Sequence, residues 1–140
     1  MAKISTGDYV HAAHFRSALR SFHRVAERAA QRAGLTPQRH LLLLMIRGSP
    51  DGTGSATVTD LAERLQLAQS TVTELVNRAE DAGLVERRSS PDDGRVVQLQ
   101  VTADGERRLA RIMADLRSEQ DDLEAAFEQL PHGGGRITVG

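Results

Sequence analysis

The sequence contains no cysteine among its 140 residues. This absence excludes disulfide bonds, thiol catalysis, cysteine-ligated zinc and peroxide sensing through a thiol. Aromatic residues make up only 3% of the chain, with no tryptophan and a single tyrosine, which excludes a stacking platform for single-stranded nucleic acid. The longest apolar run, residues 41–46, is too short to span a bilayer, and no apolar signal segment follows the first residues. We therefore expect a cytoplasmic protein without a membrane partner.

Neither sign of charge dominates the composition. The chain contains eighteen lysine and arginine residues and nineteen aspartate and glutamate residues, which gives a formal net charge of −1. A protein that coats nucleic acid through bulk charge is excluded, whereas a local basic patch remains compatible with this balance. Hydrophobic residues amount to 39%, which is enough for one hydrophobic core in a single domain of this length.

Two long amphipathic helices are predicted, one near each end of the chain. In the first, residues about 8–34, apolar positions recur in alternating steps of three and four, which indicates a helical seam. The second begins after Thr102 and extends over residues about 103–130, with one polar interruption at Gln120. Such seams are difficult to bury within one small monomer, so we expect the two helices to form a twofold dimer. The predicted dimerisation residues are Phe15, Leu19, Phe22, Leu109, Met113, Leu116, Leu123 and Phe127.

Two short helices between these seams have the spacing of a helix-turn-helix. Thr57 and Asp60 have the spacing of a capping box, which predicts a helix from this point, and a second helix is predicted from about Gln69 to Ala82. The outward side of the second helix carries polar side chains that can bond to base edges and phosphates. These residues are Gln69, Ser70, Thr73, Glu74, Asn77 and Arg78.

The hydrophobic period changes from helical to alternating after Gly83. Residues 84–88 and 97–101 are predicted strands, and the segment between them is rich in turn-forming residues. A helix-turn-helix followed by such a hairpin is a winged helix. The predicted fold is mainly α with a small β-hairpin, in one domain over residues 1–140. In it, DNA-binding residues about 57–102 are flanked by the long dimerisation helices, and residues 131–140 form a flexible tail.

The helix pair, the wing and the flanking helices occur in an order that resembles the multiple-antibiotic-resistance regulator (MarR) family. The resemblance rests on residues 58–65, 70–80 and 83–87, and on Asp93-Gly94-Arg95 followed by Leu99, Thr102 and Gly105. It implies a homodimeric winged-helix transcription factor, usually a repressor of a pseudo-palindromic operator. It also implies a small aromatic or phenolic effector that lowers DNA affinity in many members.

The resemblance carries DNA-binding roles to individual positions of this sequence. It places Ser70, Thr71, Thr73, Asn77 and Arg78 on the recognition helix. On the wing, it places Arg95 at the arginine that enters the minor groove and Asp93 at the acidic partner that orients it. Gln69 at the start of the second short helix is added to this set, as are Arg87 and Arg88, which are expected near phosphates. The predicted DNA-binding residues are Gln69, Ser70, Thr71, Thr73, Asn77, Arg78, Arg87, Arg88, Asp93 and Arg95.

The sequence departs from the family pattern at two points. The position of Glu74 is often basic in relatives, and a carboxylate repels phosphate but can accept a hydrogen bond from the amino group of cytosine. Base preference therefore cannot be transferred from relatives. The chain also turns to Pro131 and three glycines where a further dimerisation helix often follows.

A second functional interpretation remains open from the residues alone. Residues 58–101 contain five arginines and eight acidic residues, a net charge of −3, which is compatible with a winged-helix protein-interaction module that lacks specific DNA binding. Salt dependence of duplex binding separates the two interpretations.

Enzymatic activity and a cofactor are not expected. The serines of the loop, the second short helix and the wing, at positions 49, 55, 70, 89 and 90, have no histidine nearby in the sequence. Gly52-Thr53-Gly54 lacks the lysine and following helix of a phosphate-binding loop. His11 and His14 are three residues apart on one helix face, a spacing that can bind metal, but no cysteine supports them. We predict no metal; ordinary packing or surface roles are expected for the helix histidines, with the lining of a ligand pocket as an alternative.

Overall fold

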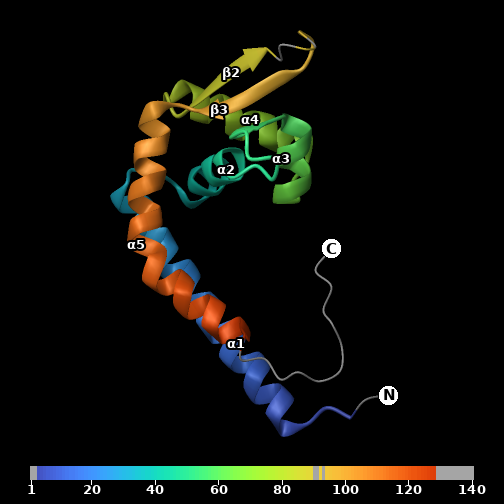
Figure 1. The fold of residues 1–140 in the computed structure, drawn as a ribbon, viewed down its shortest axis with the longest axis vertical. Helices are drawn as coiled ribbons and strands as arrows, with labels where there is room; N and C mark the ends of the chain where they lie inside the picture. Colours follow the sequence, from blue (N-terminus) through green and yellow to red (C-terminus); the bar gives the residue numbers. More distant parts are fainter. Residues whose placement is uncertain (1–2, 90–91, 93, 129–140) are drawn as a thin grey trace. The chain divides into compact units, whose positions relative to one another are not determined.

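The computed structural model describes residues 3–89, 92 and 94–128 of the chain. It confirms a mainly helical fold with a small antiparallel sheet (Figure 1). Within the described residues, no helix is both long and apolar enough to cross a membrane. In chain order, the elements are α1 (Thr6–Arg32), α2 (Pro37–Arg47), β1 (Ser55–Ala56), α3 (Val58–Leu65), α4 (Gln69–Asp81), β2 (Val85–Ser89), β3 (Val97–Val101) and α5 (Ala103–Glu128).

The chain divides into two compact units, to both of which α1 and α5 contribute. One unit comprises residues 27–115 and contains the whole winged helix, and the other comprises the described parts of residues 1–26 and 116–140. The assignment of residues 1–140 to a single domain stays a prediction. The predicted tail, residues 131–140, lies outside the described residues.

The core of the unit formed by residues 27–115 lies among the short helices and the sheet. Its largest side chains come from α2, α3, α4, β3 and α5, so every layer of the winged helix contributes to it. On α3 and α4 the side chains of Leu61, Val72, Val76 and Ala79 face this core and have no exposed surface. The largest fully buried side chains are Leu42, Leu43, Ile46, Leu61, Val72, Val76, Leu99 and Ile112.

Local capping explains where the helices of the helix-turn-helix begin and end. The Thr57 hydroxyl accepts a hydrogen bond from the Asp60 amide at 3.1 Å, and the Asp60 carboxylate accepts one from the Thr57 amide at 3.2 Å. The predicted capping box is therefore present. Gln66 ends α3 in a left-handed conformation with φ of 56°, and Gly83 follows α4 with φ of 74°, a region that glycine adopts without a side-chain clash.

The wing is a hairpin of β2 and β3, as predicted, with Val85 opposite Val101 and Ser89 opposite Val97. A third strand was not predicted, because β1 comprises only two residues at the end of a segment that reads as a loop. β1 pairs with the other edge of β3, where Ala56 lies opposite Leu99. A two-residue strand carries no periodicity of its own, and its formation depends on pairing with a residue more than 40 positions away.

α5 begins directly at the base of the wing. The Thr102 hydroxyl accepts a hydrogen bond from the Gly105 amide at 3.2 Å and donates one to the Gly83 carbonyl at 2.7 Å. A Cβ atom at Gly105 would lie only 2.6 Å from the Leu84 carbonyl oxygen and from Val101 Cγ1. The first turn of α5 is therefore packed backbone-to-backbone against the end of the helix-turn-helix.

Gly105→Ala should destabilise the protein by about 1–3 kcal/mol, because the added methyl group overpacks a contact with a backbone oxygen that cannot move away. An alanine in an unobstructed helix would instead stabilise it. Urea denaturation measures the difference. Gly7→Ala in α1 is the matched control, since its Cβ would meet only Ser5 Oγ at 3.5 Å. A Gly105→Ala variant as stable as wild type would contradict this packing argument.

Apolar residues on α1 and α5 differ in how much the single chain covers them. Leu109 and Leu116 are already buried within the chain, at 4% exposed each, and the unpredicted Ile112 is fully buried. Met113 and Phe127, by contrast, are 42% and 50% exposed. In the unit formed by the chain ends, the Phe127 ring meets Phe15 edge-on at a centroid distance of 5.7 Å. The residues with apolar surface left for a partner are therefore Phe15, Leu19, Phe22, Met113, Leu123 and Phe127.

Candidate nucleic-acid interface

One side of α4 is polar and solvent-exposed along its whole length. Burial of Val72, Val76 and Ala79 fixes the rotation of the helix, which leaves the opposite side open to solvent. The structure thus brings the predicted recognition-helix residues to one exposed surface of α4. They are Gln69, Ser70, Thr71, Thr73, Asn77 and Arg78.

Arg78 is paired with a carboxylate on its own helix. It forms an i,i+4 ion pair with Glu74, and both side chains are more than 60% exposed. Exposed ion pairs of this kind contribute about 0–1 kcal/mol, because water screens them and the two side chains lose conformational freedom when they pair. Glu74, the departure noted in the sequence, therefore neutralises Arg78 in the free protein, and a phosphate can replace it at little energetic cost.

Arg87 extends from β2 across to α4. Its Nε donates a hydrogen bond to Glu80 Oε1 at 3.2 Å, and its Nη2 donates to Asn77 Oδ1. The guanidinium therefore connects two α4 residues that lie about one turn apart. Sequence reasoning placed Arg87 and Asn77 in the same interface but did not predict this contact, because it depends on how the hairpin packs against the helix.

The remaining predicted residues belong to the wing. Arg88 forms an ion pair of 2.9 Å with Glu86 on the same strand, and its side chain is 62% exposed. Arg95 is exposed in the segment that precedes β3. Asp93 lies outside the described residues, so its orienting role toward Arg95 stays a prediction.

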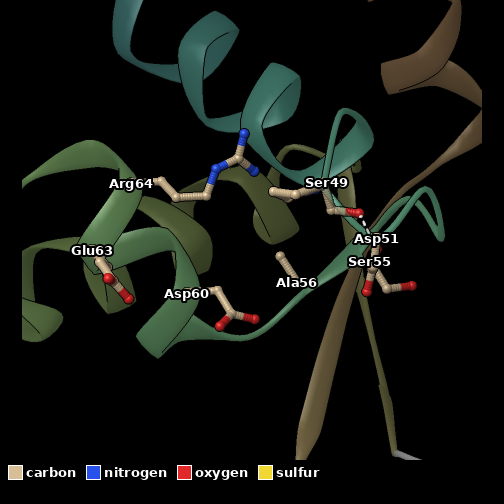
Figure 2. A pocket seen from close by; sticks show the side chains of 8 residues that line it. Ser49, Asp51, Ser55, Ala56, Asp60, Glu63 and Arg64 are labelled. Atoms are coloured by element: carbon tan, nitrogen blue, oxygen red, sulfur yellow. Dashed lines mark hydrogen bonds between the residues drawn. The ribbon is translucent and has the colours of Figure 1, made fainter. Parts of the chain in front are cut away.

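A polar hollow of about 360 Å³ lies beside α3, and none of its lining residues belongs to α4 (Figure 2). Arg64 lines it and donates hydrogen bonds to the carbonyl oxygens of Met45 at 2.7 Å and Gly48 at 3.5 Å, which closes the end of α2. Asp51 accepts from the Ser49 hydroxyl at 2.9 Å and from Thr53. The Thr53 amide and the two hydroxyls lower the pKa of the Asp51 carboxyl. These groups satisfy one another, so we assign the hollow a structural role.

A second hollow, of about 450 Å³, lies where α1 ends and α5 begins, and four arginines line it with one aspartate. Arg108 donates to the Ala33 carbonyl at 2.9 Å and lies 3.4 Å from Asp104. Arg32 pairs with Asp115 at 3.7 Å. Arg108 thus satisfies a carbonyl just beyond the end of α1, much as Arg64 does at α2.

The MarR family matches the chain over residues 33–96, which include the entire helix-turn-helix and β2 of the wing but end before β3. A Thauera aromatica protein named for transcriptional regulation of the hcr operon is 33% identical over 118 residues. The match covers 84% of this chain and 69% of that relative. The protein belongs to the MarR family. Members of this family are transcriptional regulators rather than enzymes, as the sequence predicted.

A second relative of this MarR-family chain is the HTH-type transcriptional repressor MdtR of Bacillus subtilis (strain 168). It is 29% identical over 84 residues, which cover 60% of this chain and 52% of MdtR. The chain therefore spans about half the length of that relative.

Solved structures of MarR-family regulators share the fold at low sequence identity. AbsC from Streptomyces coelicolor has a TM-score of 0.68 at 21% identity, with 91% of this chain and 90% of AbsC covered. A mutant of MarR from E. coli, complexed with operator DNA, has a TM-score of 0.60 at 21% identity, with coverage of 83% and 90%. NadR in complex with 4-hydroxyphenylacetate has a TM-score of 0.65 at 22% identity, with coverage of 91% and 84%.

The four histidines that the structure describes in this MarR-family chain fall into two environments. His14 and His23 are exposed on α1 and His11 is partly exposed, and the described residues contain no group of three potential metal ligands. His40 on α2 was not singled out from the sequence, yet it is only 9% exposed, and its Nε2 has no hydrogen-bond partner among the described residues. Burial without a partner lowers the pKa of His40 below its usual value of 6.5.

His40 should make the protein less stable in mild acid. The unfolded chain binds a proton at His40 near pH 6.5, whereas the folded chain binds it only at lower pH, because the pKa of His40 is lowered by burial. The free energy of unfolding therefore decreases as the pH falls from about 6.5 toward the lower pKa of the folded state. Urea denaturation at pH 7 and pH 5 should show that His40→Phe reduces this decrease. His23→Gln controls for the removal of an exposed histidine. A His40→Phe variant with the wild-type pH dependence would refute the role of His40.

Proposed function

We propose that the protein is a homodimeric, cytoplasmic repressor that binds a pseudo-palindromic operator and is released by a small aromatic or phenolic ligand. The observation that carries the DNA-binding part is the exposed polar side of α4 beside the arginines of β2. In this arrangement α4 would enter the major groove, where amide and hydroxyl side chains can read base edges. Arg95 of the wing would reach the neighbouring minor groove.

The paired charges of this surface fit DNA binding better than protein binding, even though residues 58–101 carry a net negative charge. Arg78, Arg87 and Arg88 each pair with a glutamate on the same surface, and two of the pairs are largely exposed. Phosphates can displace the two exposed pairs, those of Arg78 and Arg88, because the energy lost is about 1 kcal/mol or less for each. The E. coli MarR mutant bound to operator DNA supports the same function through its shared fold.

A salt titration of duplex binding tests this function. Each phosphate contact should contribute roughly −0.9 to the slope of log affinity against log salt concentration, because binding releases counterions. Arg95→Ala should make this slope shallower by about one unit per half-site. A protein-interaction module would show no salt-dependent affinity for duplex DNA. That result would contradict the proposed function and favour a role in protein binding.

The repressor and effector parts rest on similar proteins. The relative MdtR is named a transcriptional repressor, and the NadR structure contains 4-hydroxyphenylacetate. A panel of phenolic acids should include a compound that lowers operator affinity and raises the melting temperature of the free protein. If no phenolic acid changes either quantity, the effector part of the proposal is wrong.

A further inference from the structure

Glu74 lies at the centre of the exposed side of α4. It is two residues from Val72 and two residues from Val76, and neither valine has any exposed surface. Successive residues turn by about 100° around the axis of an α-helix, so Glu74 lies nearly opposite both valines and hence opposite the core. Its side chain is 62% exposed. If α4 enters a groove, the Glu74 carboxylate is therefore directed at the floor of that groove.

Arg78, the ion-pair partner of Glu74, lies nearer the edge of this exposed side. It directly precedes Ala79, which is fully buried, so the two residues are only about 100° apart around the helix. The edge of a helix that lies in a groove is the part closest to the phosphates. A phosphate can take Arg78 from Glu74 because their ion pair is exposed and weak. The Glu74 carboxylate then needs a new hydrogen-bond donor, and the base edges can supply one.

The chemistry of a carboxylate limits which base edges Glu74 can bind. An ionised carboxylate accepts hydrogen bonds and donates none. In the major groove, cytosine and adenine each present an amino donor, whereas guanine and thymine present no donor. Adenine also presents the acceptor N7 beside its amino group, which repels a carboxylate oxygen, but cytosine presents the amino group alone. Cytosine is therefore the base that suits Glu74 best, and guanine or thymine would place acceptor against acceptor.

We propose that Glu74 is a specificity-determining residue that selects cytosine at one position of each operator half-site and disfavours guanine and thymine there. This inference rests on the proposed function, in which α4 enters the major groove. A carboxylate that only repels phosphates would lower the affinity for every duplex alike. A carboxylate that binds a base edge also changes the order of preference among the four bases at one position.

The test uses a duplex that the wild-type protein selects from a random-sequence library, with all four base pairs placed in turn at each half-site position. Glu74→Ala identifies the position that Glu74 reads, because discrimination there should disappear. Wild type should favour cytosine over guanine and over thymine at this position by about tenfold. Fluorescence anisotropy at one fixed salt concentration measures each affinity.

Glu74→Gln should change the preferred base from cytosine to adenine at the same position. A glutamine amide can accept from the N6 amino group of adenine and donate to its N7, so the affinity for adenine relative to cytosine should rise by about tenfold. Affinity for all duplexes should also rise, since a negative charge is removed. Glu63→Gln is the matched control, because it removes the same charge from an exposed position on α3. It should leave the order of preference unchanged at every position.

Two results would overturn the inference. One is a Glu74→Gln variant that gains affinity evenly and keeps the wild-type order of preference, which would make Glu74 a source of phosphate repulsion alone. The other is a wild type that favours guanine or thymine at the position where Glu74→Ala removes discrimination. Failure of the proposed function looks different, since wild type would then show no salt-dependent binding to any duplex.

Discussion

Insertion of five base pairs between the two operator half-sites should lower the affinity of the protein to its non-specific level. Half-site centres of a twofold dimer are expected about 10 bp apart, so five extra base pairs turn one half-site to the opposite side of the duplex. Only one α4 could then reach its bases. The expected loss is about a thousandfold or more, the usual ratio of specific to non-specific binding.

Fluorescence anisotropy at fixed salt concentration measures this loss. The control duplex carries the same five base pairs outside the half-sites, so its length and charge are matched while the spacing is unchanged. Equal affinity for the two duplexes would exclude simultaneous reading of both half-sites by a twofold dimer.

Lysine at Met113 or Phe127 should dissociate the proposed dimer. Both side chains are about half exposed in the single chain, so lysine should leave the fold of each subunit intact. In the dimer, the same lysine would bury a charge without a partner, which we expect to weaken association by about 3 kcal/mol or more, roughly a hundredfold. Sedimentation equilibrium at micromolar concentration measures the change.

Met113→Leu is the matched control, because it keeps the volume and apolar character of the side chain. Leu116→Lys is less informative, since Leu116 is buried within the chain itself and lysine there would destabilise the subunit. A wild-type protein that sediments only as a monomer, or lysine variants with unchanged association, would refute the dimer as proposed.

Local features of this chain could be predicted from sequence because their causes lie within a few residues. The capping box of Thr57 and Asp60 and the alternation of β3 are examples, and the structure contains both. The exposed polar side of α4 followed from the same reasoning, since its helical period is set by neighbours three and four residues away.

Features that depend on distant partners could not be predicted in the same way. β1 forms only because Ala56 meets Leu99, and Arg87 reaches Asn77 only because the hairpin packs on α4. The helical period predicts Met113 for the apolar side of α5, whereas the chain itself buries Ile112 one residue earlier. A heptad pattern identifies an apolar side of a helix but not which of two adjacent residues the chain itself covers.

The joint at Thr102 has a consequence for how the winged helix opens transiently. The Thr102 amide donates to the Leu84 carbonyl at 3.0 Å, and the Leu84 amide donates to Ala79 near the end of α4 at 2.9 Å. Because only Thr102 separates β3 from α5, no linker allows the base of the wing to open while the first turn of α5 stays closed. In hydrogen exchange, the amides of Leu84, Thr102 and Gly105 should therefore exchange together as one cooperative unit.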